Sequence, residues 1–384
     1  MRSFAAAGAG PTDGRPAAPV RIGALFRAFF RISLLVVGGG YAIAAAADET
    51  FGRRLRWLKE GEILDHLPII STVPGLVAGN TAIYVGLRTT GRFGALAALA
   101  AVALPSYLVF SAVTLGLASL PQGCTWLEGA FLGLRSSLAG IVAALAARAL
   151  LRGPVDWSAA APLKLAPLSR GRRIAAGALF AVALALAAAV SAPALWAFLG
   201  FGSVCVGGGF PLVPLYERVF VGSSAPLLQM DAQAFSNLIA FTQMTPGPVS
   251  VNAATYFGWR LAGWAGGLVA TAALLTPSYF LMAAALAGLV RGRGSRAVRL
   301  LLGALKYVSA ALMLAACWSF AKVSVLRFPP GGGWSVDLAA FALAAFAAVA
   351  MTRRRMPIMA LIAICAAAGA AVALLRSSLP GGGA

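Results

Sequence analysis

Long apolar segments, separated by short polar or basic stretches, follow one another along almost the whole chain. Most of them reach the roughly 18 to 20 residues that an α-helix needs to cross a bilayer. They cover residues 22–47, 62–88, 93–118, 127–150, 172–190, 192–216, 232–258, 263–290, 300–323, 336–352 and 356–376. This pattern predicts an all-α integral membrane protein with about 11 transmembrane segments and a cytoplasmic N-terminus.

The composition agrees with a membrane setting. Of the 384 residues, 60% are hydrophobic and only 11% are charged, and the mean hydropathy is +0.86. Because a soluble domain carries about a quarter charged residues, most of this surface is expected to face lipid. The net charge of +20 comes from basic residues gathered between apolar segments, such as 353–355. That distribution is typical of cytoplasmic loops and argues against nucleic acid as a partner.

The chain contains an internal repeat. Residues Pro74–Tyr107 align without a gap on Pro246–Tyr279, at an offset of 172, and 17 of the 34 positions are identical. The identities include prolines, an asparagine, tyrosines and an arginine, which the Ala- and Leu-rich composition does not explain. Upstream, Gly38–Gly40 align on Gly207–Gly209. We therefore expect a disordered tail at 1–20, a first repeat at 21–190 and a second at 191–384.

Loop charge reverses between the two repeats. The loop at 119–126 has no Lys or Arg, whereas its counterpart at 291–299 has four Arg; the loop at 152–173 is basic and its counterpart at 324–335 has one Arg. By the positive-inside rule the repeats lie in opposite orientations, an architecture of transporters that bind substrate between the halves. The basic stretch 51–59 does not fit this topology, so an interfacial amphipathic helix is the alternative for it.

Proline and glycine interrupt one apolar segment in each repeat. Pro74-Gly75 and Pro246-Gly247-Pro248 make a continuous helix unfavourable there. A helix that restarts after such a break points its free N–H groups at the gap, where they attract anions. Since no Lys or Arg lies within 60–87 or 219–259, backbone groups and neutral side chains are expected to hold an anion in the middle of the pore. The candidate binding residues are Gly38, Gly39, Gly40, Gly75, Asn80, Gly207, Gly208, Gly209, Thr245, Gly247, Asn252, Arg88 and Arg260.

Each of these residue types also has a structural explanation. The triple glycines can bring backbone close to a ligand or simply permit tight helix packing. Asn80 and Asn252 can donate to an oxyanion or cap broken helix ends. Arg88 and Arg260 can bind a tetrahedral dianion with two parallel hydrogen bonds, or they can anchor helix ends at the membrane–water interface. The sequence leaves these alternatives open.

The element VCVGGGFPLVP and the element TPGPVSVNAATYFGWRLAGWAGG followed by TPSYF resemble the chromate transporter (CHR) family. The resemblance covers roughly 22–150 and 192–323 and is similar to the long, fused form of that family. It implies a bacterial inner-membrane carrier that exports chromate, in exchange with sulfate or coupled to the proton gradient. Leu76 replaces the second proline in the first repeat, and Tyr41 stands opposite Phe210 without a following proline.

Other functions receive less support from the sequence. A carrier of the same architecture for an organic anion is the main alternative. A membrane enzyme would need a catalytic constellation, and no GxSxG, His cluster or aspartate-rich motif is present. With one histidine and four scattered cysteines, neither a metal site nor another cofactor is expected. The expected partners are chromate or sulfate and the lipid bilayer, with a homodimer left open.

Overall fold

The computed structural model of the chain describes residues 20–36, 40–117, 125–151, 192–206, 209–291, 296–327, 334–353, 356 and 358–378. In the first repeat its elements are α1 (Ile22–Leu35), α2 (Gly40–Asp48), the π-helical turn η1 (Glu49–Arg54), α3 (Glu62–Asp65), α4 (Leu67–Thr72), α5 (Val77–Thr89), α6 (Gly91–Leu117) and α7 (Thr125–Leu151). In the second they are the helix Ala192–Val204, the 3-10 turn η2 (Phe210–Leu212), α9 (Val213–Phe220), α10 (Ala232–Met244), α11 (Val249–Arg291), α12 (Arg296–Ser324), β1 (Leu326–Arg327), β2 (Ser335–Val336), α13 (Leu338–Thr352) and α14 (Ile358–Ser378).

Within the described residues, four helices are long and apolar enough to cross a membrane. These stretches are Gly91–Ala112, Thr125–Arg148, Val249–Leu286 and Ala360–Ser378. Shorter apolar helices occupy Ala192–Val204, Ala310–Ser324 and Leu338–Thr352. The fold is therefore an all-α membrane protein, as predicted. Of the 11 predicted spans, the one at 172–190 lies outside the described residues, and several others consist of shorter helices rather than single long ones.

The prolines account for the broken helices. The predicted span 62–88 consists of α3, α4 and α5, and helix stops at Thr72 before Pro74-Gly75. The predicted span 232–258 breaks in the same way between α10 and α11. α11 then continues through a sharp bend at Ala262 and Gly263, where φ is −152° and 60°. The interruption predicted at both Pro-Gly sequences is confirmed.

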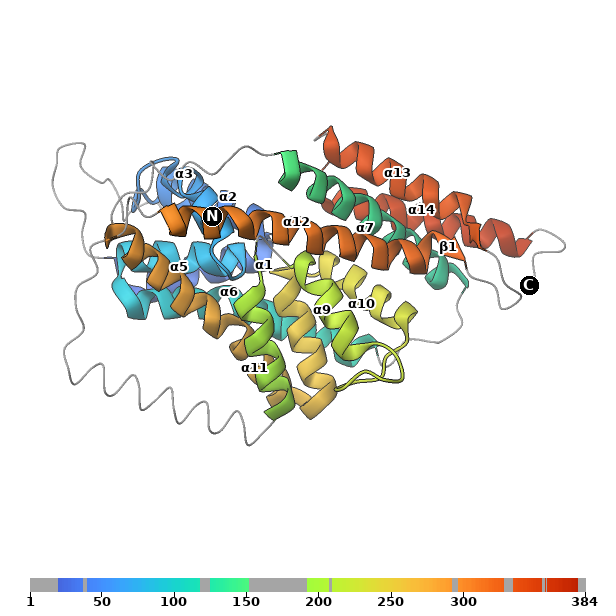
Figure 1. The fold of residues 1–384 in the computed structure, drawn as a ribbon, viewed down its shortest axis with the longest axis horizontal. Helices are drawn as coiled ribbons and strands as arrows, with labels where there is room; N and C mark the ends of the chain where they lie inside the picture. Colours follow the sequence, from blue (N-terminus) through green and yellow to red (C-terminus); the bar gives the residue numbers. More distant parts are fainter. Residues whose placement is uncertain are drawn as a thin grey trace, which may run out of the picture.

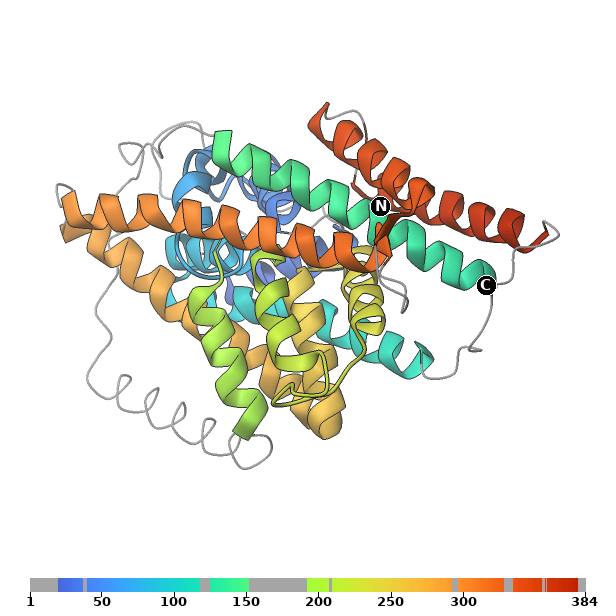
Figure 2. The ribbon, with the colours of Figure 1, turned by 45° about the vertical axis from the view of Figure 1, so that its right-hand side comes forward.

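The helices form two neighbouring groups (Figures 1 and 2). In the first, α6 packs against α1, α5 and α11. In the second, α7 lies between α12 on one side and the α13–α14 pair on the other. Small residues allow the close approach, since Gly133 lies against the backbone of Cys365 in α14 and Gly140 against that of Ala344 in α13.

Two local features were not predicted. The strands β1 and β2 form a short antiparallel pair that leads into α13. The stretch 51–59 is not a continuous helix: after the π-helical turn η1 the chain is irregular. Phe51, the first of its two aromatic residues, is buried against Phe29, with ring centroids 4.8 Å apart, while Arg53 and Arg54 pair with Glu49 at the surface. Burial of Phe51 thus fixes this segment.

Candidate functional site

The two Pro-Gly turns have the same backbone form. Gly75 has a φ of 133° and Gly247 a φ of 97°, values that side-chain-bearing residues rarely adopt. Two residues later, α5 begins at Val77 and α11 at Val249. Each turn therefore faces the first N–H groups of a new helix, the partly positive end that favours an anion.

The two buried asparagines close these turns. The Asn80 side chain donates through Nδ2 to the carbonyls of Ile70 (2.9 Å) and Val73 (3.0 Å). At the same offset of 172, Asn252 donates to the carbonyls of Thr242 (3.1 Å) and Thr245 (3.5 Å). Of the two roles left open by the sequence, capping of the preceding broken helix is the one this geometry provides, because both amide donors are already used.

Residues of each repeat lie against the turn of the other. A Cβ atom on Gly75 would lie 2.7 Å from Ser278 Oγ, and a Cβ atom on Gly247 would overlap Ser106 Oγ. The Ser278 and Ser106 positions are again 172 apart. Likewise the Tyr107 hydroxyl of the first repeat donates to the Trp264 carbonyl of the second (3.0 Å). With the roles of the repeats reversed, the Tyr279 hydroxyl donates to the Arg92 carbonyl (3.3 Å). Exchanged contact pairs of this kind are what a two-fold relation between similar units produces.

Ser106 and Ser278 lie at these turns, and the sequence reasoning did not include them. Their signal was the repeated Pro-Ser-Tyr, which was read only as the end of the repeat. Ser278 Oγ is buried and has no hydrogen-bond partner among the described residues, and the same is true of the amide oxygens of Asn80 and Asn252. Beside Gly75, the Asn80 amide oxygen and the Ser278 hydroxyl approach the same point to within 2.6 and 2.7 Å. The turn thus holds unused polar atoms from both repeats.

The triple glycines are described only in part. Gly38, Gly39, Gly207 and Gly208 lie outside the described residues. A Cβ atom on Gly40 would come within 2.8 Å of Val77 Cβ, and one on Gly209 within 2.9 Å of Val249 Cβ. The last glycine of each triplet therefore lies against the first turn of the helix that restarts after the Pro-Gly break. Thr245 lies beside that break, and its hydroxyl donates to the Phe241 carbonyl (3.1 Å).

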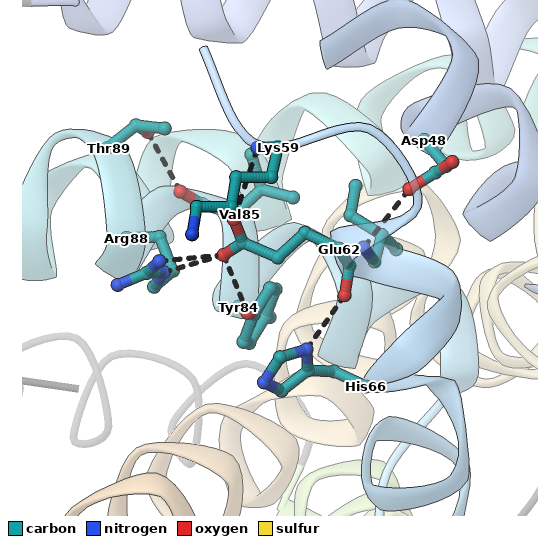
Figure 3. Close-up of polar contacts among 9 residues, drawn as sticks. Asp48, Lys59, Glu62, His66, Tyr84, Val85, Arg88 and Thr89 are labelled. Atoms are coloured by element: carbon teal, nitrogen blue, oxygen red, sulfur yellow. Dashed lines mark hydrogen bonds and ion pairs between the residues drawn. The ribbon is translucent and has the colours of Figure 1, made fainter. Parts of the chain in front are cut away.

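The two candidate arginines have different surroundings. The guanidinium of Arg88 contacts Glu62 Oε1 through both Nε and Nη2 at 2.8 Å, and the buried Glu62 also accepts from the Tyr84 hydroxyl at 3.0 Å (Figure 3). The amide of Lys59 donates to the other oxygen of this carboxylate. Two of the three nitrogen atoms of the Arg88 guanidinium are thus engaged by the Glu62 carboxylate.

Arg260 has no such carboxylate, since Ala234 stands where the repeat would place a second Glu62. Its guanidinium donates to the Tyr256 hydroxyl at 3.2 Å and lies 6.0 Å from the centre of that ring. Arg260 is exposed. Within the described residues, only the second repeat therefore has an arginine without a paired carboxylate at this position.

The Glu62–Arg88 pair is expected to stabilise the first repeat. Replacing Glu62 with Gln should lower the free energy of unfolding by about 2 kcal/mol, because it leaves Arg88 without its charged acceptor. Arg260→Gln is the matched control and should change stability by less than about 0.5 kcal/mol. Thermal unfolding of the purified variants in detergent measures both. Equal melting temperatures for Glu62→Gln and wild type would contradict the assignment.

The apolar helices and their interrupted Pro-Gly segments define a multi-pass membrane protein. A family model described as Chromate transporter matches residues 23–196 and, a second time, residues 192–370. The chain therefore belongs to the chromate transporter family and is a membrane transporter. The predicted resemblance is confirmed.

Several curated relatives span most of the chain. A probable chromate transport protein of Synechococcus elongatus is 26% identical over 66% of this chain and 72% of its own. A chromate transport protein of Cupriavidus metallidurans is 25% identical over 65% of this chain and 70% of its own. An uncharacterized transporter of Methanocaldococcus jannaschii is 24% identical over 67% and 74%. No solved structure matches the chain.

Proposed function

We propose that this transporter is a secondary carrier that moves chromate- or sulfate-type oxyanions across a bacterial inner membrane, with chromate leaving the cell. The names of the relatives supply the substrate class for this proposal. Its physical support is the exchanged pair of turns, where Gly75 meets Ser278 and Gly247 meets Ser106. Each turn offers free helix N–H groups, which can donate to an oxyanion. Beside Gly75 the Ser278 hydroxyl of the other repeat has no partner among the described residues and can also donate, whereas the Ser106 hydroxyl beside Gly247 donates to the Pro246 carbonyl at 3.5 Å.

The geometry favours an anion that needs many hydrogen bonds. A tetrahedral oxyanion presents four oxygens, and burying its charge without partners would cost tens of kcal/mol. The N-termini of α5 and α11 and the Ser278 hydroxyl would distribute that charge. An organic anion remains the alternative, and it would need an additional apolar surface beside the carboxylate.

We propose further that the two repeats are inverted in the membrane. The exchanged contacts support a two-fold relation, and the reversal of loop charge supports an axis in the membrane plane. The loops at 119–126 and 291–299 should then lie on opposite sides. Labelling of single cysteines introduced into each loop would refute the inversion if both reacted from the same side.

Counterflow in proteoliposomes tests the function. Liposomes loaded with sulfate should take up external radiolabelled sulfate or chromate, and a hundredfold excess of a dicarboxylate should compete weakly. Failure of both oxyanions to exchange, together with exchange of the dicarboxylate, would establish the organic-anion alternative.

The same counterflow assay tests whether the Ser278 hydroxyl binds the oxyanion. Ser278→Ala should raise the apparent KM about tenfold, the effect of one lost hydrogen bond to a charged ligand, without lowering the melting temperature. Stability should hold because the hydroxyl has no protein partner. Ser324→Ala is the control, since that hydroxyl bonds only the Phe320 carbonyl of its own helix. Unchanged KM in Ser278→Ala would remove the serine from the site.

A further inference from the structure

A buried arginine lies in α7, away from the Pro-Gly turns. The Arg135 residue is only 4% exposed, and its Nε and Nη1 atoms have no hydrogen-bond partner in the part of the chain that the structure describes. None of the ion pairs of the described residues includes Arg135. An unpaired guanidinium inside a protein is strongly unfavourable, so something absent from the folded chain alone is expected to compensate it.

Arg135 lies near the middle of an apolar stretch that is long enough to cross a membrane. It follows the start of the apolar stretch Thr125–Arg148 by ten residues, which places it about 15 Å along a helix that crosses a hydrocarbon core of roughly 30 Å. Ionisable groups at such depth face the protein interior or a water-filled cavity, and they mark ion pathways and relays.

The helix packing directs Arg135 toward the interior of the molecule. Gly133 and Gly140, seven residues apart, lie on the face of α7 that meets α14 and α13. Arg135 and Ala139 are one turn apart and share a different face, and the thiol of Cys317 in α12 donates to the Ala139 carbonyl at 3.4 Å. α7 also packs against α10, the helix that ends at the second Pro-Gly turn.

Two carboxylates act on the charge of Arg135 without pairing with it. Asp231 and Glu128 are its electrostatic neighbours. Asp231 already accepts from the N–H groups of Gln233 and Ala234 as the N-cap of α10. Glu128 lies seven residues back along α7, near the helix start. Neither carboxylate is within ion-pair distance, so the guanidinium keeps free donors.

Another arginine of the same helix serves as a contrast. Arg148 donates to the backbone carbonyls of Met351 and Thr352. These hydrogen bonds connect the end of α7 with the end of α13. Its role is accounted for by these contacts. Arg135 has the same side chain in the same helix but no equivalent acceptors.

We propose that Arg135 is an anion-binding residue within the membrane and that its ligand is the tetrahedral dianion carried by the protein. This inference rests on the proposed function for the identity of the ligand. It changes the sequence-based expectation that the middle of the pore relies on neutral donors. A guanidinium presents parallel N–H groups that match two oxygens of chromate or sulfate, and the dianion would supply the charge that Arg135 lacks.

Two measurements on the full-length protein test this proposal. The first is the rise in melting temperature in detergent when chloride is replaced with sulfate or chromate at equal ionic strength. The second is the apparent KM for sulfate counterflow. Arg135→Gln should abolish the anion-dependent rise and raise the apparent KM about ten- to a hundredfold, as expected for a lost charged hydrogen bond. Arg135→Lys keeps the positive charge but loses the two parallel N–H donors. It should therefore retain part of the anion-dependent rise in melting temperature and part of the affinity for sulfate. Comparing sulfate with chromate shows which anion the arginine prefers.

Arg148→Gln is the matched control. It should lower the melting temperature of the ligand-free protein and leave both the anion-dependent rise and the apparent KM at wild-type values. A wild-type anion response in Arg135→Gln, or no response in the wild-type protein, would overturn the assignment. A third result would separate the two proposals. If the melting temperature responds to anion through Arg135 but the protein exchanges neither sulfate nor chromate, the anion site is supported and the proposed transport function is rejected.

Discussion

Gly247→Ala is expected to reduce oxyanion counterflow at least about a hundredfold, a larger loss than that predicted for Ser278→Ala. Two effects act together. Alanine is strained at a φ of 97°, at a cost of about 1 kcal/mol, and its methyl group would overlap the Ser106 hydroxyl, which overpacks the contact by about 1–3 kcal/mol more. The turn or α6 must move in response. Either movement would displace the free N–H groups of α11 from the proposed site.

A substitution at a second glycine distinguishes the effect of backbone strain from that of the steric overlap with Ser106. Gly263 also has a positive φ, 60°, but a Cβ atom there would meet no other atom within 4 Å. Gly263→Ala should therefore cost about 1 kcal/mol of stability and leave most of the transport rate intact. The measurement is the initial rate of sulfate counterflow at equal amounts of inserted protein. Equal losses in the two variants would mean that glycine is needed only for its backbone conformation and that the contact between the repeats is unimportant.

Sequence alone could predict the helices and the place of their breaks. Apolar length indicates membrane helices, and Pro74 and Pro246 interrupt them for a local steric reason that needs no knowledge of the fold. The internal repeat also predicted that equivalent residues would have equivalent surroundings. The paired hydrogen bonds of Asn80 and Asn252 agree with that expectation.

The remaining features depend on contacts between distant residues. Ser278 reaches Gly75 across about 200 positions of the chain, and no local pattern encodes that approach. Glu62 pairs with Arg88 only because the break at Pro74 folds α3 back toward the end of α5. Arg135 is apparent in the sequence as a single charge within an apolar segment, but its lack of a partner can be seen only after the neighbouring helices are packed.

The second large effect is expected at the buried asparagines. Asn252→Leu should lower the free energy of unfolding by about 2–4 kcal/mol and abolish counterflow, because the carbonyls of Thr242 and Thr245 lose their side-chain donor inside the protein. Asn80→Leu should have a similar effect through Ile70 and Val73. Asn252→Asp should be as harmful as leucine, since a carboxylate has the same shape but cannot donate to a carbonyl when ionised.

Ligand-free stability decides between the two roles of these asparagines. If Asn252 caps the broken end of α10, the melting temperature of Asn252→Leu falls even without oxyanion, and adding sulfate does not restore it. If Asn252 instead donates to the substrate, the ligand-free melting temperature stays at the wild-type value and only the response to sulfate is lost. We expect the first result, because Nδ2 is already bonded to two carbonyls, and the second for Ser278→Ala, whose hydroxyl has no protein partner. The same measurement on one polar residue from each Pro-Gly turn thus distinguishes a group that holds its turn from a group that meets the anion.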